Sequence, residues 1–250
     1  MVSEHEGQRG AAQARALLVG LGGLGCPAAL ALVRAGIGEL VLCDDDVVDE
    51  GNLHRQILYG PADVGADKLD AARAALEREA ERTGTRLTLV RSRFLPENAR
   101  ELVRSVDVLI EGADNFATKF LSADAACLER RPVVHGAGIR WMGTAWAVAP
   151  HGRPCYRCLF EDVPVGAQPN CDSAGVMGPV VGVVGALMAE LALRVACGHP
   201  PWGELWSFDG KADTLRRVPV SARAECPLCG SSPSIVDTDE SRYQSGQCAA

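Results

Sequence analysis

Short apolar runs alternate with helical segments along the first half of the chain. The runs are bounded by glycine and acidic residues, and the segments between them have the apolar spacing of helices. Strands that alternate with helices predict βαβ units and a mainly parallel sheet with flanking helices. The expected strands are 15–20, 38–46, 86–94, 107–114 and 132–138. The expected helices are 26–36, 65–82, 96–106 and 116–130.

The pattern changes after residue 140. The runs at 143–150, 205–210 and 214–220 predict strands with antiparallel partners, which would extend the sheet. Between them, residues 159–175 are rich in Pro, Gly, Asp and Asn and show no period. A loop this long in a compact domain is usually functional or mobile. Polar residues from 231 to 250 predict a disordered tail.

An apolar stretch at 178–198 is about long enough to span a bilayer. Glu190 and Arg194 interrupt it at i, i+4 spacing, where they can pair on one helix face. Small residues within the stretch suit close packing against a sheet or a second helix. We therefore expect a buried helix of a soluble protein and no membrane span.

Composition and charge narrow the possible partners. The formal net charge of −7 argues against broad contact with nucleic-acid phosphates, which needs a basic surface. The first residues, MVSEHEGQRG, are polar and acidic and predict no signal peptide. Ten cysteines in such a chain indicate reduced thiols, metal ligands or catalysis rather than a disulfide framework. We expect a cytoplasmic protein.

A glycine motif follows the first expected strand. Gly20, Gly22 and Gly25 match G-x-G-x-x-G before a helix, a Rossmann-like arrangement in which the backbone approaches phosphate closely. Asp44 comes 19 positions after Gly25, where a carboxylate can accept hydrogen bonds from ribose hydroxyls. A dinucleotide-dependent oxidoreductase uses the same glycines, and a tight turn without a ligand is a further alternative. The glycines alone do not separate NAD from ATP.

The residues after the second strand favour a triphosphate. Asn52, Arg55 and Gln56 lie just beyond the acidic strand end, and Lys68 follows. Arg55 and Lys68 would supply fixed cations for β- and γ-phosphates, whereas an NAD enzyme needs an open slot for nicotinamide. The alternative is that Arg55 is an ordinary surface cation.

Asp114 and Asn115 follow the fourth expected strand. Oxygen ligands of this kind suit Mg²⁺, so both side chains are candidates to hold the ion against the phosphates. The alternative for Asp114 is a purely structural role as the N-cap of the next helix.

Two C-x-x-C pairs lie far apart in the chain. Cys155 and Cys158 form one pair, and Cys226 and Cys229 form the other. Four thiolates are the tetrahedral set that structural Zn²⁺ prefers, and such a metal would close a long excursion of the chain. A redox pair is the alternative for a single C-x-x-C, but it needs no second pair.

Cys171 lies in the irregular loop, before the helix expected from about Gly178. A thiol near a helix N-terminus can have a lowered pKa and act as a nucleophile. The alternative is an incidental loop cysteine.

Together these segments resemble the ThiF, MoeB and HesA family of sulfur-carrier protein adenylyltransferases, which are related to ubiquitin-activating enzymes. The similar stretches run in family order over residues 7–230 and are VGLGGLG, DDDVVDEGNLHRQ, VGADK, GADN, CYRCLF, AGVMGPVVGVVG and CPLCG. The resemblance implies a homodimer in which ATP and Mg²⁺ adenylate the C-terminal glycine carboxylate of a ubiquitin-like sulfur carrier ending in Gly-Gly. Adenylation would prepare the carrier for thiocarboxylate formation.

The resemblance also implies roles for particular residues. It places Asp44, with Asp46 as a second candidate, at the ribose. It places Asn52, Arg55 and Lys68 at the phosphates and Asp114 at the magnesium ion. It assigns Cys155, Cys158, Cys226 and Cys229 to the structural zinc, and Cys171 to the sulfur chemistry. We expect a single domain over 11–230, with a nucleotide-binding half at 11–140 and a zinc-clipped, carrier-binding half at 141–230. A polar segment at 1–10 and the tail at 231–250 flank it.

The beginning of the chain departs from the family pattern. Members usually begin with a segment of the form RYxRQ, which gives an arginine to the partner subunit's active site, and here only Arg9 or Arg15 is near. A truncated start, a substituting cation or weaker phosphate binding would each account for this. No rhodanese-like domain follows, so a separate protein would donate sulfur. Alternative functions are activation of a ribosomal peptide or a carrier in natural-product biosynthesis, and a nucleotide-binding scaffold that has lost catalysis.

Overall fold

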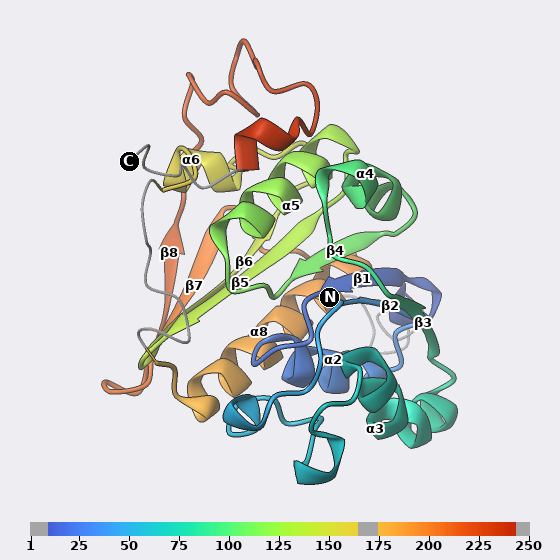
Figure 1. Ribbon diagram of the computed structural model, residues 1–250. Helices are drawn as coiled ribbons and strands as arrows, with labels where there is room; N and C mark the ends of the chain where they lie inside the picture. Colours follow the sequence, from blue (N-terminus) through green and yellow to red (C-terminus); the bar gives the residue numbers. More distant parts are fainter. Residues whose placement is uncertain (1–9, 165–174, 244–250) are drawn as a thin grey trace, which may run out of the picture.

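A mixed sheet runs through the middle of the molecule, and helices cover both of its faces (Figure 1). The computed structural model describes residues 10–164 and 175–243, and within them the sheet has eight strands in the order β3-β2-β1-β4-β5-β6-β7-β8. The strands are β1 (Arg15–Val19), β2 (Glu39–Cys43), β3 (Arg86–Val90), β4 (Val108–Glu111), β5 (Val133–Ile139), β6 (Met142–Val148), β7 (Glu204–Asp209) and β8 (Thr214–Pro219). The helices are α2 (Gly25–Arg34), α3 (Lys68–Thr83), α4 (Pro96–Arg104), α5 (Phe116–Leu128), α6 (Tyr156–Phe160) and α8 (Gly178–Ala196), with 3-10 turns η1 (Glu50–Asn52), η2 (Pro61–Asp63) and η3 (Glu240–Tyr243).

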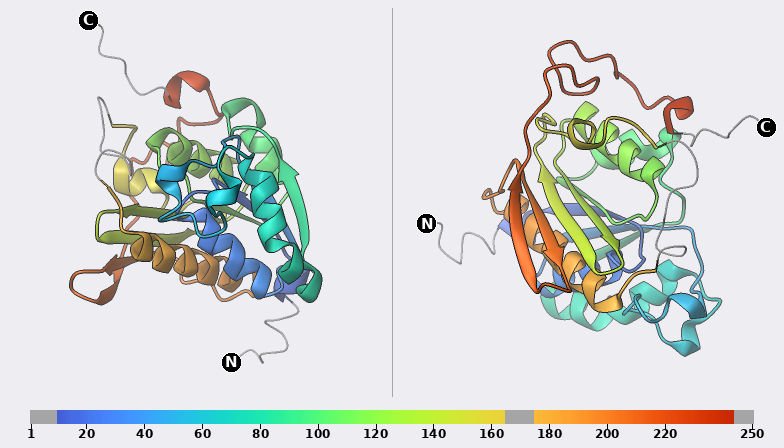
Figure 2. Two further views of the ribbon diagram at one scale, coloured as in Figure 1. Left: turned by 60° about the horizontal axis from the view of Figure 1, so that its bottom comes forward. Right: turned by 90° about the vertical axis from the view of Figure 1, so that its left-hand side faces the viewer.

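The strands divide into a parallel and an antiparallel part, as the alternation of apolar runs predicts. Strands β3, β2, β1, β4 and β5 pair in parallel. Strands β5, β6, β7 and β8 pair antiparallel and form the far edge of the sheet (Figure 2). Every residue of β2 and β4 is buried, which is characteristic of parallel strands covered on both faces. The predicted fold class is confirmed.

Two hydrophobic cores lie on opposite faces of the sheet. Helices α2, α3 and α8 enclose one, and helices α4, α5 and α6 cover the other (Figures 1 and 2). The second core also contains the four cysteines of the two C-x-x-C pairs. The metal-ligand candidates and the glycine-rich loop are therefore separated by the sheet.

The apolar stretch at 178–198 forms α8, which is long and apolar enough to cross a membrane by composition alone. In the structure α8 packs against α2, β5 and β6. Gly185 permits this close approach, because a Cβ there would lie 2.5 Å from the carbonyl oxygen of Leu24. The stretch is therefore a helix with one face packed in the core, and 44% of its apolar window is buried.

The polar segment after residue 230 is more ordered than its composition predicts. The Tyr243 hydroxyl donates a hydrogen bond to Oδ2 of the buried Asp124 at 2.9 Å, and Thr238 Oγ1 donates to the carbonyl oxygen of Pro96 at 3.1 Å. Ile235 and Tyr243 are both buried. The expectation of disorder is therefore wrong for residues 231–243, because a few anchored side chains hold a segment with little apolar content.

Candidate active site

The loops that follow β1, β2 and β4 meet at one edge of the sheet. Val19 pairs with Cys43 in one neighbouring strand and with Glu111 in the other, so these three strands end at the same level. Each strand ends earlier than the apolar pattern predicts, and the polar residues after it leave the ladder. Ligands bind beyond the carboxyl ends of such strands in doubly wound sheets.

A cavity of about 250 Å³ lies at this edge. It gathers most of the predicted nucleotide-site residues, namely Gly20, Gly22, Asp44, Asp46, Asn52, Arg55, Gln56, Lys68, Asp114 and Asn115. Gly25 does not line the cavity and lies behind the glycine-rich loop, against Gly20. A Cβ on Gly25 would overlap the carbonyl oxygen of Gly20, so this glycine allows the helix to begin directly against the strand end.

Gly20 has a backbone conformation that favours glycine. Its φ is +86°, and a Cβ there would lie 3.2 Å from the backbone nitrogen of Ala113. The glycine-rich loop after β1 therefore touches the turn after β4. This contact joins two segments that are distant in the sequence.

Asp44 is anchored to the glycine-rich loop. Its Oδ2 accepts the Leu21 backbone N–H at 2.6 Å, and its Oδ1 accepts the Asp46 backbone N–H at 2.9 Å. The carboxylate is thus oriented before any ligand binds, as a ribose acceptor requires.

Lys68 is the first residue of α3 and is only 5% exposed. Its Nζ donates to Oδ2 of Asp46 at 2.9 Å. The Asp46 carboxylate is therefore paired with Lys68 in this structure, whereas a ribose acceptor would be free to accept the hydroxyls. The pair holds the ammonium group at the cavity wall.

The segment after η1 supplies Arg55 and Gln56. A Cβ on Gly23 would lie 3.4 Å from Cγ and Cδ of Arg55, so the arginine stem runs along the glycine-rich loop. Gln56 is 3% exposed, and in the described part of the chain its Oε1 has no hydrogen-bond partner. A buried acceptor on the cavity wall fits a ligand that brings its own donor.

The N-cap of α5 is Asn115. Its side chain accepts the Thr118 backbone N–H at 2.8 Å. The alternative that Asp114 caps this helix is therefore wrong, and Asp114 is exposed to the cavity instead. Asn115 was predicted as an oxygen ligand, but its Oδ1 serves the helix end.

A second cavity of about 240 Å³ adjoins the first. Its walls are mostly apolar and come from α5, the β5–β6 hairpin and α6. The two cavities share Leu24, Ala113 and Asp114. Sequence analysis missed this cavity because its residues come from several distant segments.

Some residues of the first cavity were also missed. Arg93 lies after β3 on the same sheet edge and is 3.8 Å from Asp45 across an ion pair. The apolar pattern placed Arg93 inside the expected strand 86–94, and β3 ends at Val90 instead. Arg15, by contrast, begins β1 and donates to the Ser105 carbonyl oxygen at 2.7 Å, at the opposite end of the strands from the cavity. Arg15 therefore does not reach the cavity of its own chain, and Arg9 lies outside the described residues.

The two C-x-x-C pairs come together as predicted. The Sγ atoms of Cys155, Cys158, Cys226 and Cys229 all lie within 4.8 Å of one another, and all four residues are buried. Cys155 and Cys226 are 3.4 Å apart, as are Cys158 and Cys229. Tetrahedral zinc with Zn–S bonds of about 2.3 Å separates its sulfurs by about 3.8 Å, so the cluster fits such an ion.

Arg157 braces the first C-x-x-C pair from within. Its guanidinium donates to both oxygens of the buried Asp124, from Nε at 2.8 Å and from a terminal nitrogen at 2.9 Å. Arg223, three residues before Cys226, donates to the Arg157 carbonyl oxygen at 3.1 Å. The two cysteine loops are therefore also joined by hydrogen bonds. Cys171 lies outside the described residues.

Comparison with known proteins gives a family for the chain. The model of the ThiF family matches residues 1–228. The SAMP-activating enzyme E1 of Haloferax volcanii is 38% identical over 239 residues, covering 94% of this chain and 87% of that protein. The sulfur carrier protein adenylyltransferase of Thermus thermophilus is 39% identical over 236 residues, covering 91% and 86%.

A longer relative and a solved structure extend the comparison. The adenylyltransferase and sulfurtransferase MOCS3 of Aedes aegypti is 35% identical, and this chain spans about half of it, 53%. The crystal structure of E. coli MccB with ATP has a TM-score of 0.77 at 19% identity and covers 90% of this chain and 69% of that one, which supports the fold. The family match over nearly all the described residues, together with relatives near 40% identity, establishes that the chain belongs to the ThiF family.

Proposed function

We propose that this chain is an adenylyltransferase that activates a small ubiquitin-like sulfur-carrier protein with ATP. The observation that carries the proposal is the junction of the two cavities at Ala113 and Asp114. A polar cavity with phosphate-binding geometry and an apolar cavity meet at one carboxylate. The names of the curated relatives, a SAMP-activating enzyme and a sulfur carrier protein adenylyltransferase, support the same reaction.

ATP would occupy the polar cavity. Asp44 is oriented to accept the ribose hydroxyls, and Gln56 offers a buried acceptor beside the glycine-rich loop. Asn52, Arg55 and Lys68 would contact the phosphates. Asp114 would hold Mg²⁺, which when bound neutralises phosphate charge.

The carrier's C-terminal Gly-Gly tail would enter through the apolar cavity. Gly138 and Gly143 form part of its wall, and a Cβ on either would press on Val181 or Val184 of α8, so both positions need glycine for the packing of that helix. Ile139, Met142 and Phe160 are exposed around it and offer an apolar docking rim. The tail carboxylate would then arrive at Ala113 and Asp114, beside the α-phosphate.

The reaction follows from this arrangement. A carboxylate oxygen of the terminal glycine attacks the α-phosphorus, a new O–P bond forms, and the bond to pyrophosphate breaks. Arg55 and Lys68 balance the charge that develops on the leaving pyrophosphate. No general base is required, because the carboxylate is already ionised at neutral pH. A separate sulfur donor would convert the resulting acyl adenylate to a thiocarboxylate.

The four-cysteine cluster would bind a structural zinc ion. Its burial in the core on the α5 side, away from the polar cavity, supports a structural role over a catalytic one. We further propose that the enzyme is a cytoplasmic homodimer. A partner subunit would supply a further cation to the phosphates, and Arg93 is the candidate within the same chain.

ATP–pyrophosphate exchange tests the proposal. We expect exchange with a ubiquitin-like carrier that ends in Gly-Gly, and none with the same carrier lacking those two residues. Exchange driven only by a short ribosomal peptide would replace the carrier with a peptide substrate. ATP binding without exchange in any of these mixtures would indicate a nucleotide-binding scaffold and defeat the proposed activity.

A further inference from the structure

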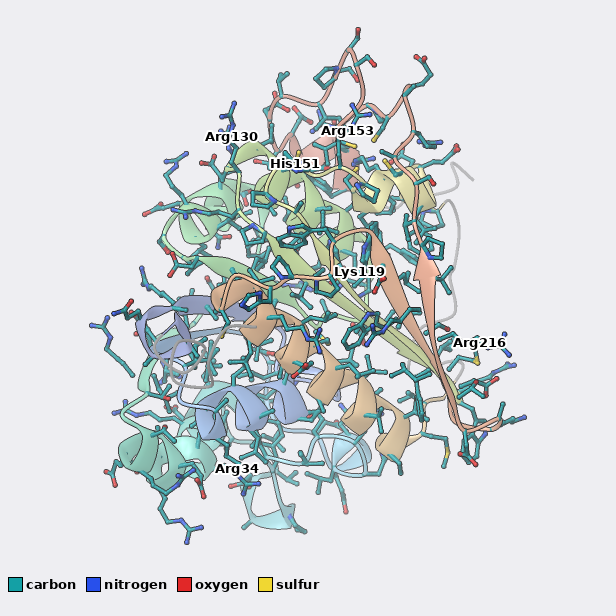
Figure 3. All side chains as sticks on the ribbon, turned by 180° about the vertical axis from the view of Figure 1, so that it is seen from behind. Arg34, Lys119, Arg130, His151, Arg153 and Arg216 are labelled. Atoms are coloured by element: carbon teal, nitrogen blue, oxygen red, sulfur yellow. The ribbon has the colours of Figure 1, made fainter. Side chains whose placement is uncertain are left out.

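Three buried polar residues lie between the β4 turn and the second cavity. Glu111 is fully buried, Lys119 is 6% exposed and His135 is 4% exposed. Lys119 Nζ donates to both Glu111 oxygens, at 3.1 and 3.0 Å, and to the Gly136 carbonyl oxygen at 2.6 Å. His135 Nδ1 lies 3.2 Å from Glu111 Oε2. Figure 3 shows Lys119 in the interior, whereas Arg34, Arg130 and Arg216 lie at the outside.

The buried charges in this group balance one another. Burial lowers the pKa of His135, so the imidazole is neutral and donates to Glu111 from Nδ1. This leaves one carboxylate and one ammonium group. A buried ion pair is no better for stability than apolar residues of the same volume, so packing alone gives no reason for it.

The Glu111 carboxylate also holds the turn after β4. Its Oε1 accepts the Ala113 backbone N–H at 2.7 Å. On the opposite side, Gly20 touches the same backbone nitrogen closely enough that a Cβ would lie 3.2 Å away. Gly112 N–H donates to the Val19 carbonyl oxygen at 3.0 Å. Two hydrogen bonds and the contact with Gly20 therefore fix the backbone of Gly112 and Ala113, immediately before Asp114.

We propose that Glu111 is a positioning residue for Asp114, acting through the side-chain oxygen that accepts the Ala113 N–H. Glu111 fixes the backbone from which Asp114 projects toward both cavities. Lys119 pairs with both Glu111 oxygens and ties them to Gly136 on β5, next to the wall of the second cavity. The inference rests on the proposed function, in which Asp114 holds Mg²⁺ where the two substrates meet.

Two double variants separate positioning from packing. Glu111→Gln with Lys119→Met removes both charges but keeps an oxygen that can accept the Ala113 N–H. Glu111→Leu with Lys119→Met removes the same charges and the acceptor together. Neither variant leaves a buried unpaired charge, so both are expected to fold.

The readout is the Mg²⁺ dependence of ATP binding to the full chain, measured by titration calorimetry. We expect the half-saturating Mg²⁺ concentration to rise about tenfold in the Leu/Met variant, the scale of leaving one buried backbone donor without an acceptor, and less than about twofold in the Gln/Met variant. ATP binding without Mg²⁺ should be equal in both. Equal Mg²⁺ dependence in the two variants, shifted or not, would overturn the positioning role.

A single variant covers the case in which the Leu/Met protein does not fold. Glu111→Asp keeps the charge paired with the flexible Lys119 but shortens the reach to Ala113 by one methylene. It should show the same rise in Mg²⁺ requirement, and an unchanged requirement would overturn the proposal. The binding measurement needs no carrier. Failure of carrier-dependent exchange would therefore defeat the proposed function, but the Mg²⁺ dependence of ATP binding could still be interpreted.

Discussion

The Asp44 carboxylate accepts a hydrogen bond from the backbone N–H of Leu21 at 2.6 Å. This bond joins the end of β2 to the glycine-rich loop after β1, across 23 positions of sequence. One side chain therefore shapes the loop and also faces the first cavity.

Replacing Asp44 should weaken ATP binding through both roles. We expect Asp44→Ala to lower ATP affinity at least about tenfold, because a charge-assisted hydrogen bond and a ribose acceptor are lost together. Asp44→Asn should lose less, since its amide oxygen can still accept the Leu21 N–H. Asp45→Ala is the comparison, because the neighbouring Asp45 makes only a long ion pair, 3.8 Å from Arg93. Equal losses in the Asp44→Ala and Asp45→Ala variants, measured by calorimetry, would contradict the anchoring role.

The cysteine cluster should contain one zinc ion per chain. We expect Cys226→Ser to reduce the zinc content measured by elemental analysis and to lower the midpoint of thermal unfolding, because metal binding contributes folding free energy. Cys127→Ala is the matched control. Cys127 lies near the cluster, and its Sγ is 3.8 Å from the His151 carbonyl oxygen. Loss of zinc in the Cys127 variant, or retention in the Cys226 variant, would contradict the assignment.

Glu129 should make stability depend on pH. The Arg104 and Arg100 guanidiniums, which donate to this carboxylate at 2.8 and 2.6 Å, hold its pKa below the ordinary 4.5. A carboxyl whose pKa is lower in the folded state stabilises the protein above its unfolded pKa, and this contribution disappears as pH falls through the folded value.

Glu129→Gln tests that dependence. At pH 7 it should lower the free energy of unfolding in urea by about 1 kcal/mol, the scale of a partly exposed ion pair. The difference from the unchanged protein should vanish well below the ordinary pKa of 4.5. Glu81→Gln, on the exposed face of α3, should show no such pH-dependent difference. A Glu129 effect that persists unchanged at low pH would rule out the ion pairs as its cause.

Cys171 remains a proposed sulfur-transfer residue. We expect Cys171→Ser to leave ATP–pyrophosphate exchange intact, because adenylation needs only the two cavities. Transfer of sulfur to the carrier should be impaired, because the serine hydroxyl cannot form a persulfide or an acyl disulfide. Thiocarboxylate formation followed by mass spectrometry measures this, and normal transfer would make Cys171 an incidental loop cysteine.

Local patterns predicted the parallel half of the fold and most of the residues that line the first cavity. Gly20 and Asp44 could be predicted because each follows a buried strand, and parallel strands end at one edge of a sheet. The four cysteines could be predicted because two C-x-x-C pairs are a complete tetrahedral set. In both cases the spacing of the residues along the chain was enough to predict which of them lie close together.

Other features depended on contacts between distant segments. Tyr243 is anchored because a buried carboxylate, Asp124, lies 119 positions earlier, so polar composition alone predicted disorder wrongly. Asn115 rather than Asp114 caps α5, a choice made by backbone angles at the helix start. Arg93 reached the cavity because β3 ends beside β2, which its own sequence does not indicate.

The sequence by itself determined the order of the strands and helices and which side chains have the chemistry to bind phosphate and metal, because apolar periodicity and ligand preference are local properties. Only the tertiary structure decided which of those groups line the same cavity. The second cavity, the Glu111–Lys119 pair and the junction at Asp114 arise where β4, α5 and β5 pack together. Side chains far apart along the chain become neighbours there only once the sheet has formed and excluded water from between them.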